Sequence, residues 1–157
     1  MPSRRELIRM TDDEIRDYLA LEKTLIIVSN GRDGYPHPMP MWFHADAEGC
    51  LYCTTFGKSQ KVVNWRRDPK ATLMVESGED YAELKGVMIQ ARTEIIEDVE
   101  AVKDTLVDIN AKGRALDDAG RAKLRDAVGG TAAKRVVLKF HPQKRVSWDH
   151  AKLGGRY

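Results

Sequence analysis

Six short runs of strand-forming residues, separated by turn residues at regular spacing, constrain the fold of this chain more than any other feature. The first two runs are joined by Asn30–Gly34, whose residue types favour the tight turn of a β-hairpin. The second and third are joined by a further turn segment, Asp46–Gly49. Strands spaced this regularly predict an antiparallel β-barrel. The runs are residues 24–29, 35–45, 50–55, 71–76, 85–96 and 135–140, the last resuming at about 144–148.

Helices are expected to flank this barrel, so the predicted fold class is mainly β with flanking helices. Thr11 and Glu14 form a capping box, which predicts a helix that begins directly after Thr11. Apolar residues recur at helical spacing within residues 98–129, which predicts a helical insertion there. A chain of 157 residues is expected to form one domain over residues 1–157, with a C-terminal tail at about 147–157.

The composition argues against several classes of protein. Hydrophobic residues make up 42% and charged residues 32% of the chain, which is ordinary for a soluble domain. A net charge of +2 is too small for a chain that binds nucleic acid over its whole surface, so no nucleic-acid partner is expected. No apolar run approaches the roughly 20 residues of a membrane-spanning helix, and the start lacks a signal-peptide core. We therefore expect a cytoplasmic protein without a membrane partner.

Neither the cysteines nor the histidines predict a metal or redox site. Cys50 and Cys53 lie three residues apart in a predicted strand, where they point to opposite faces. This favours a packing role over a redox pair or half of a zinc site. The four histidines lack the spacing of metal ligands on a common element, so no bound metal is expected.

The segment Thr54–Lys61 joins the end of a predicted strand to the start of a short helix, with a turn at Gly57. A helix start offers unpaired N–H groups and a positive dipole end, so the hydroxyls and lysines gathered here suit a phosphate or another anion. The segment lacks the second glycine and the βαβ setting of a P-loop, which argues against nucleotide hydrolysis. The alternative interpretation is a polar turn with solvated lysines.

Two further segments point towards a bound ring. Pro38 and Pro40 occupy alternate positions of one strand, where they remove hydrogen-bond donors. Such a strand is expected at a sheet edge, or where a ligand ring takes the place of a neighbouring strand. Trp148 lies in a polar, glycine-ended tail that cannot form a core of its own, so we expect it to pack on another part of the protein.

Three segments of the chain carry a resemblance to a known family. They are Gly-Tyr-Pro-His-Pro-Met-Pro-Met-Trp-Phe (residues 34–43), Thr-Thr-Phe-Gly-Lys-Ser-Gln-Lys-Val-Val-Asn-Trp-Arg-Arg-Asp-Pro (54–69) and the strand at 86–94. Together they resemble the pyridoxamine 5′-phosphate oxidase-like split β-barrel family of flavin and deazaflavin oxidoreductases. This resemblance implies a six-stranded antiparallel split β-barrel. The ending at 147–154 is similar to the actinobacterial-type branch, whose members mostly use the deazaflavin coenzyme F420.

In that family the cofactor lies in a groove at a homodimer interface, and the resemblance implies the same arrangement here. By position, Lys61 and Ser59 would hold the cofactor phosphate. The other implied contacts are Lys58 and Asn64 near the phosphate, Met39, Pro40, Met41 and Trp42 along the ring, Thr54 and Thr55 towards its edge or ribityl chain, Gln90 on a strand that approaches from the partner subunit, and Trp148 in the tail.

The function implied by the resemblance is hydride transfer by a flavin-type cofactor to a small organic acceptor, with the protein binding and orienting both. Reduced F420 is the favoured cofactor, and FMN is the close alternative. A second alternative is a non-catalytic flavin- or haem-binding protein of the same fold. The chain has Gln60 before Lys61 where pyridoxamine phosphate oxidases carry arginine, so pyridoxal phosphate synthesis is not expected.

Overall fold

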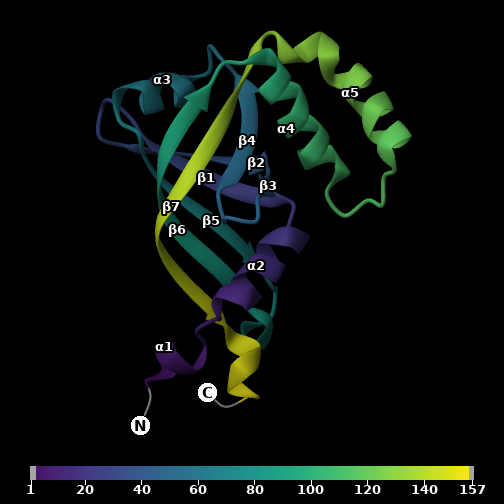
Figure 1. The fold of residues 1–157 in the computed structure, drawn as a ribbon. Coiled ribbons are helices and arrows are strands. Elements are labelled where there is room, and N and C mark those ends of the chain that lie inside the picture. Colours follow the sequence, from purple (N-terminus) through teal and green to yellow (C-terminus); the bar gives the residue numbers. More distant parts are fainter. Residues whose placement is uncertain (1–2, 156–157) are drawn as a thin grey trace.

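A computed structural model describes residues 3–155, in which one antiparallel sheet of seven strands forms the centre of the molecule (Figure 1). The strand order is β2-β1-β5-β6-β7-β4-β3. The two edge strands, β2 and β3, follow each other directly in the chain, so the sheet must curl to bring its edges together. The strands are β1 (Thr24–Asn30), β2 (Pro36–Trp42), β3 (His44–Ala45), β4 (Leu51–Phe56), β5 (Lys70–Ser77), β6 (Lys85–Ile96) and β7 (Arg135–Asp149).

Five α-helices flank the sheet, and the predicted start of one is confirmed in atomic detail. Thr11 Oγ1 accepts from the backbone N–H of Glu14 at 3.2 Å, and the Glu14 carboxylate accepts from the N–H of Thr11 at 2.6 Å. The same capping box, formed by Ser3 and Glu6, begins a short helix that the sequence did not reveal to us. The helices are α1 (Arg4–Leu7), α2 (Asp12–Leu21), α3 (Gln60–Arg67), α4 (Val99–Ala111) and α5 (Asp118–Ala132), with 3₁₀ turns at Tyr81–Glu83 and His150–Leu153.

The mainly β antiparallel fold is confirmed, but the expected number of six strands is wrong. The run at 35–45 divides at Phe43, whose side chain is fully buried. Before it β2 pairs with β1, and after it β3 pairs with β4, so one run supplies both sheet edges. The last run does not stop at residue 140, because β7 continues through Pro142 opposite a register shift between Gln90 and Ala91.

Two boundary predictions also need correction. Helix α5 continues through Gly129 and Gly130 to Ala132, because that end of the helix packs on the sheet through Ala132 and Val128. The expected tail at 147–157 begins as strand, since β7 runs to Asp149. The last two residues of the tail lie outside the described part of the chain.

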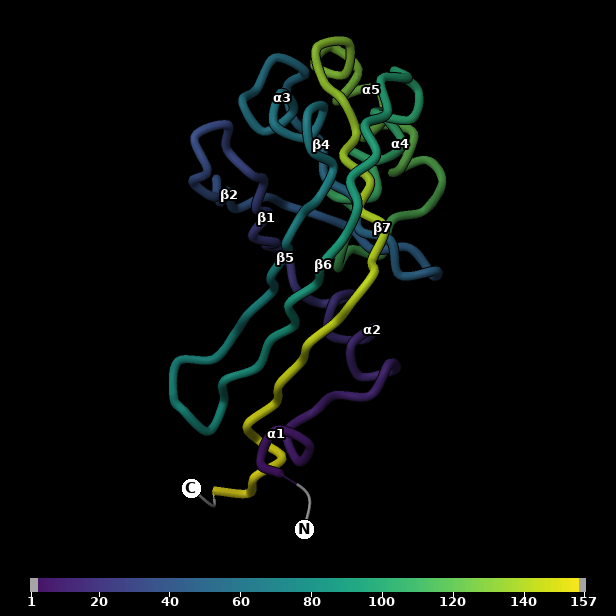
Figure 2. Tube along the Cα trace, turned by 90° about the vertical axis from the view of Figure 1, so that its left-hand side faces the viewer, coloured from purple at the N-terminus to yellow at the C-terminus, as the bar shows by residue number. Residues whose placement is uncertain are grey.

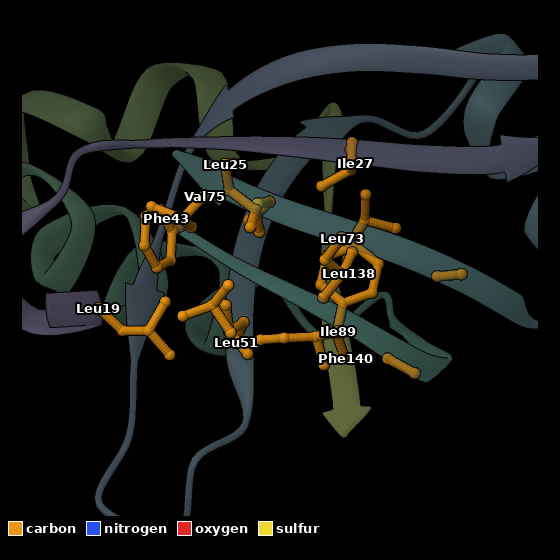
Figure 3. Close-up of a cluster of buried hydrophobic side chains, with 14 of the residues drawn as sticks. Leu19, Leu25, Ile27, Phe43, Leu51, Leu73, Val75, Ile89, Leu138 and Phe140 are labelled. Carbon is orange, nitrogen blue, oxygen red and sulfur yellow. The ribbon is translucent and has the colours of Figure 1, made fainter. Parts of the chain in front are cut away.

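The main core lies inside the curl of the sheet. Figure 3 shows side chains from β1, β4, β5, β6 and β7 that meet there together with Leu19 and Phe43. Helix α3 closes one end, where the Trp65 ring packs edge-on against Phe140 with 5.3 Å between ring centroids. Burial of each such large side chain stabilises the fold by about 1.5–3 kcal/mol.

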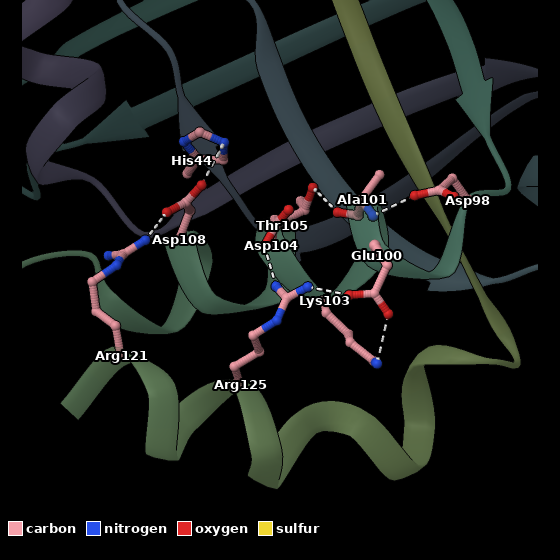
Figure 4. Close-up of polar contacts among 10 residues, drawn as sticks. All are labelled: His44, Asp98, Glu100, Ala101, Lys103, Asp104, Thr105, Asp108, Arg121 and Arg125. Atoms are coloured by element: carbon pink, nitrogen blue, oxygen red, sulfur yellow. Dashed lines mark hydrogen bonds and ion pairs between the residues drawn. The ribbon is translucent and has the colours of Figure 1, made fainter. Parts of the chain in front are cut away.

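Helices α4 and α5 cover the opposite face of β4 and β7 (Figure 1). Val102 and Leu106 of α4 pack there against Val137. The two helices are joined on their outer side by ion pairs of Arg121 and Arg125 with carboxylates of α4, drawn in Figure 4. The acidic side chains of α4 are therefore already partnered by α5.

Candidate functional site

The start of α3 leaves several polar groups free for a ligand. Ser59 occupies the N-cap position, but its hydroxyl does not cap the helix and instead lies 3.4 Å from Thr55 Oγ1. The Ser59 carbonyl accepts from the N–H groups of Val62 and Val63. Within residues 3–155, no acceptor is found for the backbone N–H groups of Gln60 and Lys61. Two hydroxyls and two N–H groups therefore converge where an anion is favoured by the helix dipole.

Lys61 adds a positive charge to this helix start. Its side chain is only 9% exposed, and it forms no ion pair with any residue that the structure describes. Burial lowers the pKa of the Lys61 ammonium, and the nearby Cys53 thiol opposes this shift. A buried charge without a partner costs stability. A bound anion would supply the missing partner.

Asn64 holds α3 in place. Its side-chain N–H group donates to Ser29 Oγ on β1 at 2.9 Å, and its Oδ1 accepts from Gln60 at 3.0 Å. Asn64 is 1% exposed, so this contact fixes the helix against the sheet. Lys58, by contrast, is exposed and forms no ion pair among the described residues.

Thr54 and Thr55 lie on opposite faces of β4, as the alternation of a strand requires. Thr55 faces the inside of the curl with Cys53 and approaches Ser59. Thr54 faces outwards, where its hydroxyl lies 3.4 Å from Nη1 of Arg135. Only Thr55 therefore belongs to the polar cluster at the start of α3.

Strand β2 also presents its predicted contacts on two faces. Met39 and Met41 pack against the core from the inner side. Pro40 and Trp42 point outwards, and the Trp42 side chain is 62% exposed. The outward residues are the ones that a bound ring can reach from outside the sheet.

An apolar row crosses the outer face of the sheet beside Trp42. The strand register places its five members directly opposite one another on neighbouring strands, and all are half-buried or exposed. They are Pro40 on β2, Ile26 on β1, Met74 on β5, Met88 on β6 and Val146 on β7. Exposed apolar rows of this kind commonly mark an interaction surface.

Gln90 and Trp148 lie elsewhere on this outer face. Gln90 is exposed and lines a hollow of about 390 Å³ together with Val28 and Thr72. Trp148 packs over Gly86, where a Cβ atom would overlap the indole ring. Trp148 is far from the polar cluster at the start of α3. Thr55 of that cluster pairs with Val136 on β7, and Val136 and Trp148 are 12 residues apart, which is about 40 Å of extended strand.

The predicted contacts therefore form separate groups within one chain. Thr55, Ser59 and Lys61 meet at the start of α3, whereas Trp148 precedes Asp149, whose N–H donates to the Ile8 carbonyl at the end of α1. Figure 2 shows α1 and α3 at opposite ends of the molecule. Between them, Pro40 and Gln90 lie on the outer sheet face.

Two polar side chains near these groups were not among the predicted contacts. His37 of β2 lines a hollow of about 330 Å³ with Gln60 and Asn64, and its buried Nδ1 has no hydrogen-bond partner among the described residues. Arg135 stacks on Phe56, and its Nε is likewise buried without a partner in residues 3–155. The position of His37 between Pro36 and Pro38 was the only sequence signal for this residue, and Arg135 had none.

Two absences apply to residues 3–155. No cluster of three or more histidine, cysteine, aspartate or glutamate side chains there is arranged to hold a metal ion. None of the helices in this part of the chain has the length and apolar character that crossing a membrane requires.

Comparison with solved structures shows the same fold in several proteins. A conserved hypothetical protein from Mycobacterium tuberculosis, Rv2991, is 32% identical, with a TM-score of 0.86 over 99% of this chain and 95% of that chain. An F420 reductase is 20% identical, with a TM-score of 0.61 over 83% and 94% of the two chains. The haem storage protein HutZ from Vibrio cholerae is 16% identical, with a TM-score of 0.65 over 89% and 97%.

A comparison with curated proteins found no match. The sequence profile of pyridoxamine 5′-phosphate oxidase, however, matches residues 11–149, which include the whole sheet and the start of α3. The chain therefore belongs to the pyridoxamine 5′-phosphate oxidase family.

Proposed function

We propose that the protein is an oxidoreductase that uses a flavin-type cofactor, reduced F420 in preference to FMN, to transfer hydride to a small organic acceptor. The observation that carries this proposal is Lys61, a buried ammonium without a partner among the described residues at an uncapped helix start. Structures of the same fold include a protein named as an F420 reductase, which is consistent with the choice of cofactor.

The groups at the start of α3 fit a cofactor phosphate. Lys61 supplies the charge, while Ser59 and the free N–H groups supply hydrogen-bond donors. For the longer anionic tail of F420, Lys58 is the free basic residue, because Arg66 pairs with Glu97 and Arg67 donates to the Asn30 carbonyl. When bound, the cofactor supplies the hydride chemistry. The residues of this chain bind it, orient it and exclude water.

The proposal includes a homodimer with the cofactor groove at its interface. The apolar row from Pro40 to Val146 offers a surface that a second copy can cover. Trp148 lies too far along β7 to join Lys61 within one chain, and Gln90 lies on the outer face of the sheet, opposite the inner side on which Lys61 approaches Cys53. In the proposed dimer they reach the cofactor from the partner subunit.

The test is titration of the purified protein with F420 and, separately, with FMN, followed by cofactor fluorescence. Micromolar binding of F420 that Lys61→Ala weakens by roughly 10- to 150-fold, the effect of losing one charge-assisted contact, supports the proposal. Lys123→Ala is the matched control, because Lys123 is an exposed lysine on α5. If the protein binds FMN but not F420, the proposed cofactor is wrong and FMN takes its place. If Lys61→Ala binds the cofactor as tightly as the wild type does, the proposed phosphate contact of Lys61 is wrong.

A binding protein without turnover is the second candidate, because a protein named for haem storage shares the fold. It predicts tight uptake of a flavin or haem but no oxidation of the reduced cofactor when acceptors are added. Absorbance of reduced F420, followed with and without a panel of conjugated acceptors, separates the two functions.

A further inference from the structure

A hollow of about 230 Å³ lies where β2 meets β3, beside the end of α4. It is separate from the start of α3 and includes none of the groups assigned there to the cofactor phosphate. Its walls include Lys23, Trp42, Phe43, Asn110, Lys112 and Arg114.

Three of these residues are cations, and no acid lines the hollow with them. None of these three cations, which are Lys23, Lys112 and Arg114, forms an ion pair within residues 3–155. The nearby acid of α4, Asp108, is already engaged by Arg121 and lies 3.9 Å from His44 (Figure 4). Glu22 acts on Lys112 but forms no ion pair with it. Three cations that gather without an ion-pair partner repel one another, so this arrangement favours an anion as the missing partner.

Lys112 is the least exposed of the three cations that line the hollow. Its ammonium donates to the Phe43 carbonyl at 3.2 Å and lies 3.5 Å from the centroid of the Phe43 ring. Burial lowers the pKa of Lys112 to about 8, although the Cys53 thiol and Glu22 both act to raise it. Burial also lowers the pKa of the nearby His44, and the Lys112 charge acts in the same direction. The ammonium is thus partly removed from water, where a contact with an anion gains strength.

Trp42 gives the hollow a flat apolar wall. Its side chain is 62% exposed, which is unusual for an indole that has no ligand to cover it. Trp42 also lies on the strand that the proposed function places along the cofactor ring. A ligand in the hollow would therefore be a neighbour of the cofactor.

We propose that this hollow binds a small aromatic or conjugated carboxylate through Lys112, Arg114 and Lys23, with its ring against Trp42. In the enzyme this ligand is the hydride acceptor, a role that rests on the proposed function. One carbon of its conjugated C=C bond takes up the hydride, the other carbon takes up a proton from water, and the two electrons come from the reduced cofactor, which is oxidised. The volume is below the roughly 300 to 1,000 Å³ of pockets for drug-sized ligands, so the ligand is about the size of a single ring. The flat guanidinium of Arg114 suits a carboxylate in particular.

The probe is 4-fluorobenzoate, added to the purified protein without cofactor and followed by the line width of its ¹⁹F NMR signal. We expect binding in the millimolar range or tighter, and no binding of the uncharged 4-fluorobenzamide. Lys112→Gln should weaken binding by about tenfold, and Arg114→Gln, which removes an exposed charge, by about threefold. Arg4→Gln removes an exposed arginine of α1 and should leave the affinity unchanged.

The proposal is overturned if the benzamide binds as well as the benzoate, or if both Lys112→Gln and Arg114→Gln bind as the wild type does. Inorganic phosphate that displaces the benzoate at equal concentration would overturn the choice of a carboxylate. Because Arg114 is exposed, its variant remains informative even if Lys112→Gln fails to fold. The experiment uses no cofactor, so its result is independent of the F420 titration. Absence of benzoate binding would not contradict the proposed cofactor site, and absence of F420 binding would not contradict the proposed carboxylate site.

Discussion

Replacement of Lys61 by methionine should have opposite effects on the free protein and on its complex with a cofactor. Methionine keeps an unbranched side chain of similar length and removes the positive charge of a residue that is only 9% exposed. No ion pair with a described residue is lost. The desolvation penalty disappears, so the free energy of unfolding should stay equal or rise by up to about 1 kcal/mol. For a chain of this size that is a rise in Tm of about 2–4 °C.

Cofactor binding should fall at the same time. Loss of one charge-assisted contact costs about 1.5–3 kcal/mol, or roughly 10- to 150-fold in affinity. At a cofactor concentration of about 100 times the wild-type Kd, the wild type gains about 2.7 kcal/mol of stability. The variant should gain only about 0.3–1.3 kcal/mol under the same conditions.

Differential scanning calorimetry with and without F420 measures both effects on one sample. Lys123→Met is the matched control, because it removes an exposed lysine of α5 and should change neither quantity. Two results would refute the reasoning. One is a fall in the Tm of the free variant comparable to the loss of a core side chain, which would mean that the ammonium is stabilised by the fold. The other is an undiminished gain in stability with F420.

Four further perturbations test other parts of the structure. The pKa of Lys112 is lowered from 10.5 to about 8 in the folded protein, so between these pH values the unfolded state binds more protons than the folded state. As the pH rises from 8 to 10.5, the wild type should therefore gain about 1–3 kcal/mol of stability relative to Lys112→Gln, measured by urea unfolding. Met88→Lys places a charge in the apolar row and should yield a monomer in sedimentation experiments if that row is the dimer interface. Asn64→Ala removes the buried bond to β1 and should lower the free energy of unfolding by about 1–3 kcal/mol, with cofactor affinity changed as a consequence of helix displacement. Gly86→Ala should displace the Trp148 ring and lower stability by a similar amount, visible as a change in near-ultraviolet circular dichroism.

Local sequence signals predicted the local structure well. The bounds expected for β6, residues 85–96, are those of the structure, because its alternating apolar residues specify one buried face. The turn after β1 also formed as predicted, with the Gly31 N–H donating to the Tyr35 carbonyl at 2.9 Å. In both places neighbouring residues alone decide the outcome.

Predictions failed where distant contacts decide. Whether the run at 35–45 is one strand or two depends on the burial of Phe43 in a core that the rest of the chain builds. Gly129 and Gly130 normally end a helix, but packing of Ala132 on the sheet carries α5 past them. A local propensity of about 1 kcal/mol for each glycine is outweighed by such tertiary packing.

In the candidate site too, local features could be predicted from the sequence and features set by distant contacts could not. The opposite faces of Thr54 and Thr55 follow from strand alternation and were predictable. The burial of Lys61 was not, because it depends on how α3 closes the end of the sheet. Lys112 gave no sequence signal at all, since its contact with Phe43 joins residues that are 69 positions apart.

Lys61 and Lys112 stand out because each is partly or largely buried and yet forms no ion pair with a described residue. Acids of α4 are matched by arginines of α5, and Lys152 is matched by Glu14. Lys61 and Lys112 have no such partner among the described residues, yet each is partly or largely buried, and both act on the same buried thiol, that of Cys53. An ion-pair partner for either lysine would offset part of the cost of burying its charge. Its absence leaves the fold less stable and keeps both ammonium groups available, which is the arrangement expected where the counter-charge arrives with a ligand.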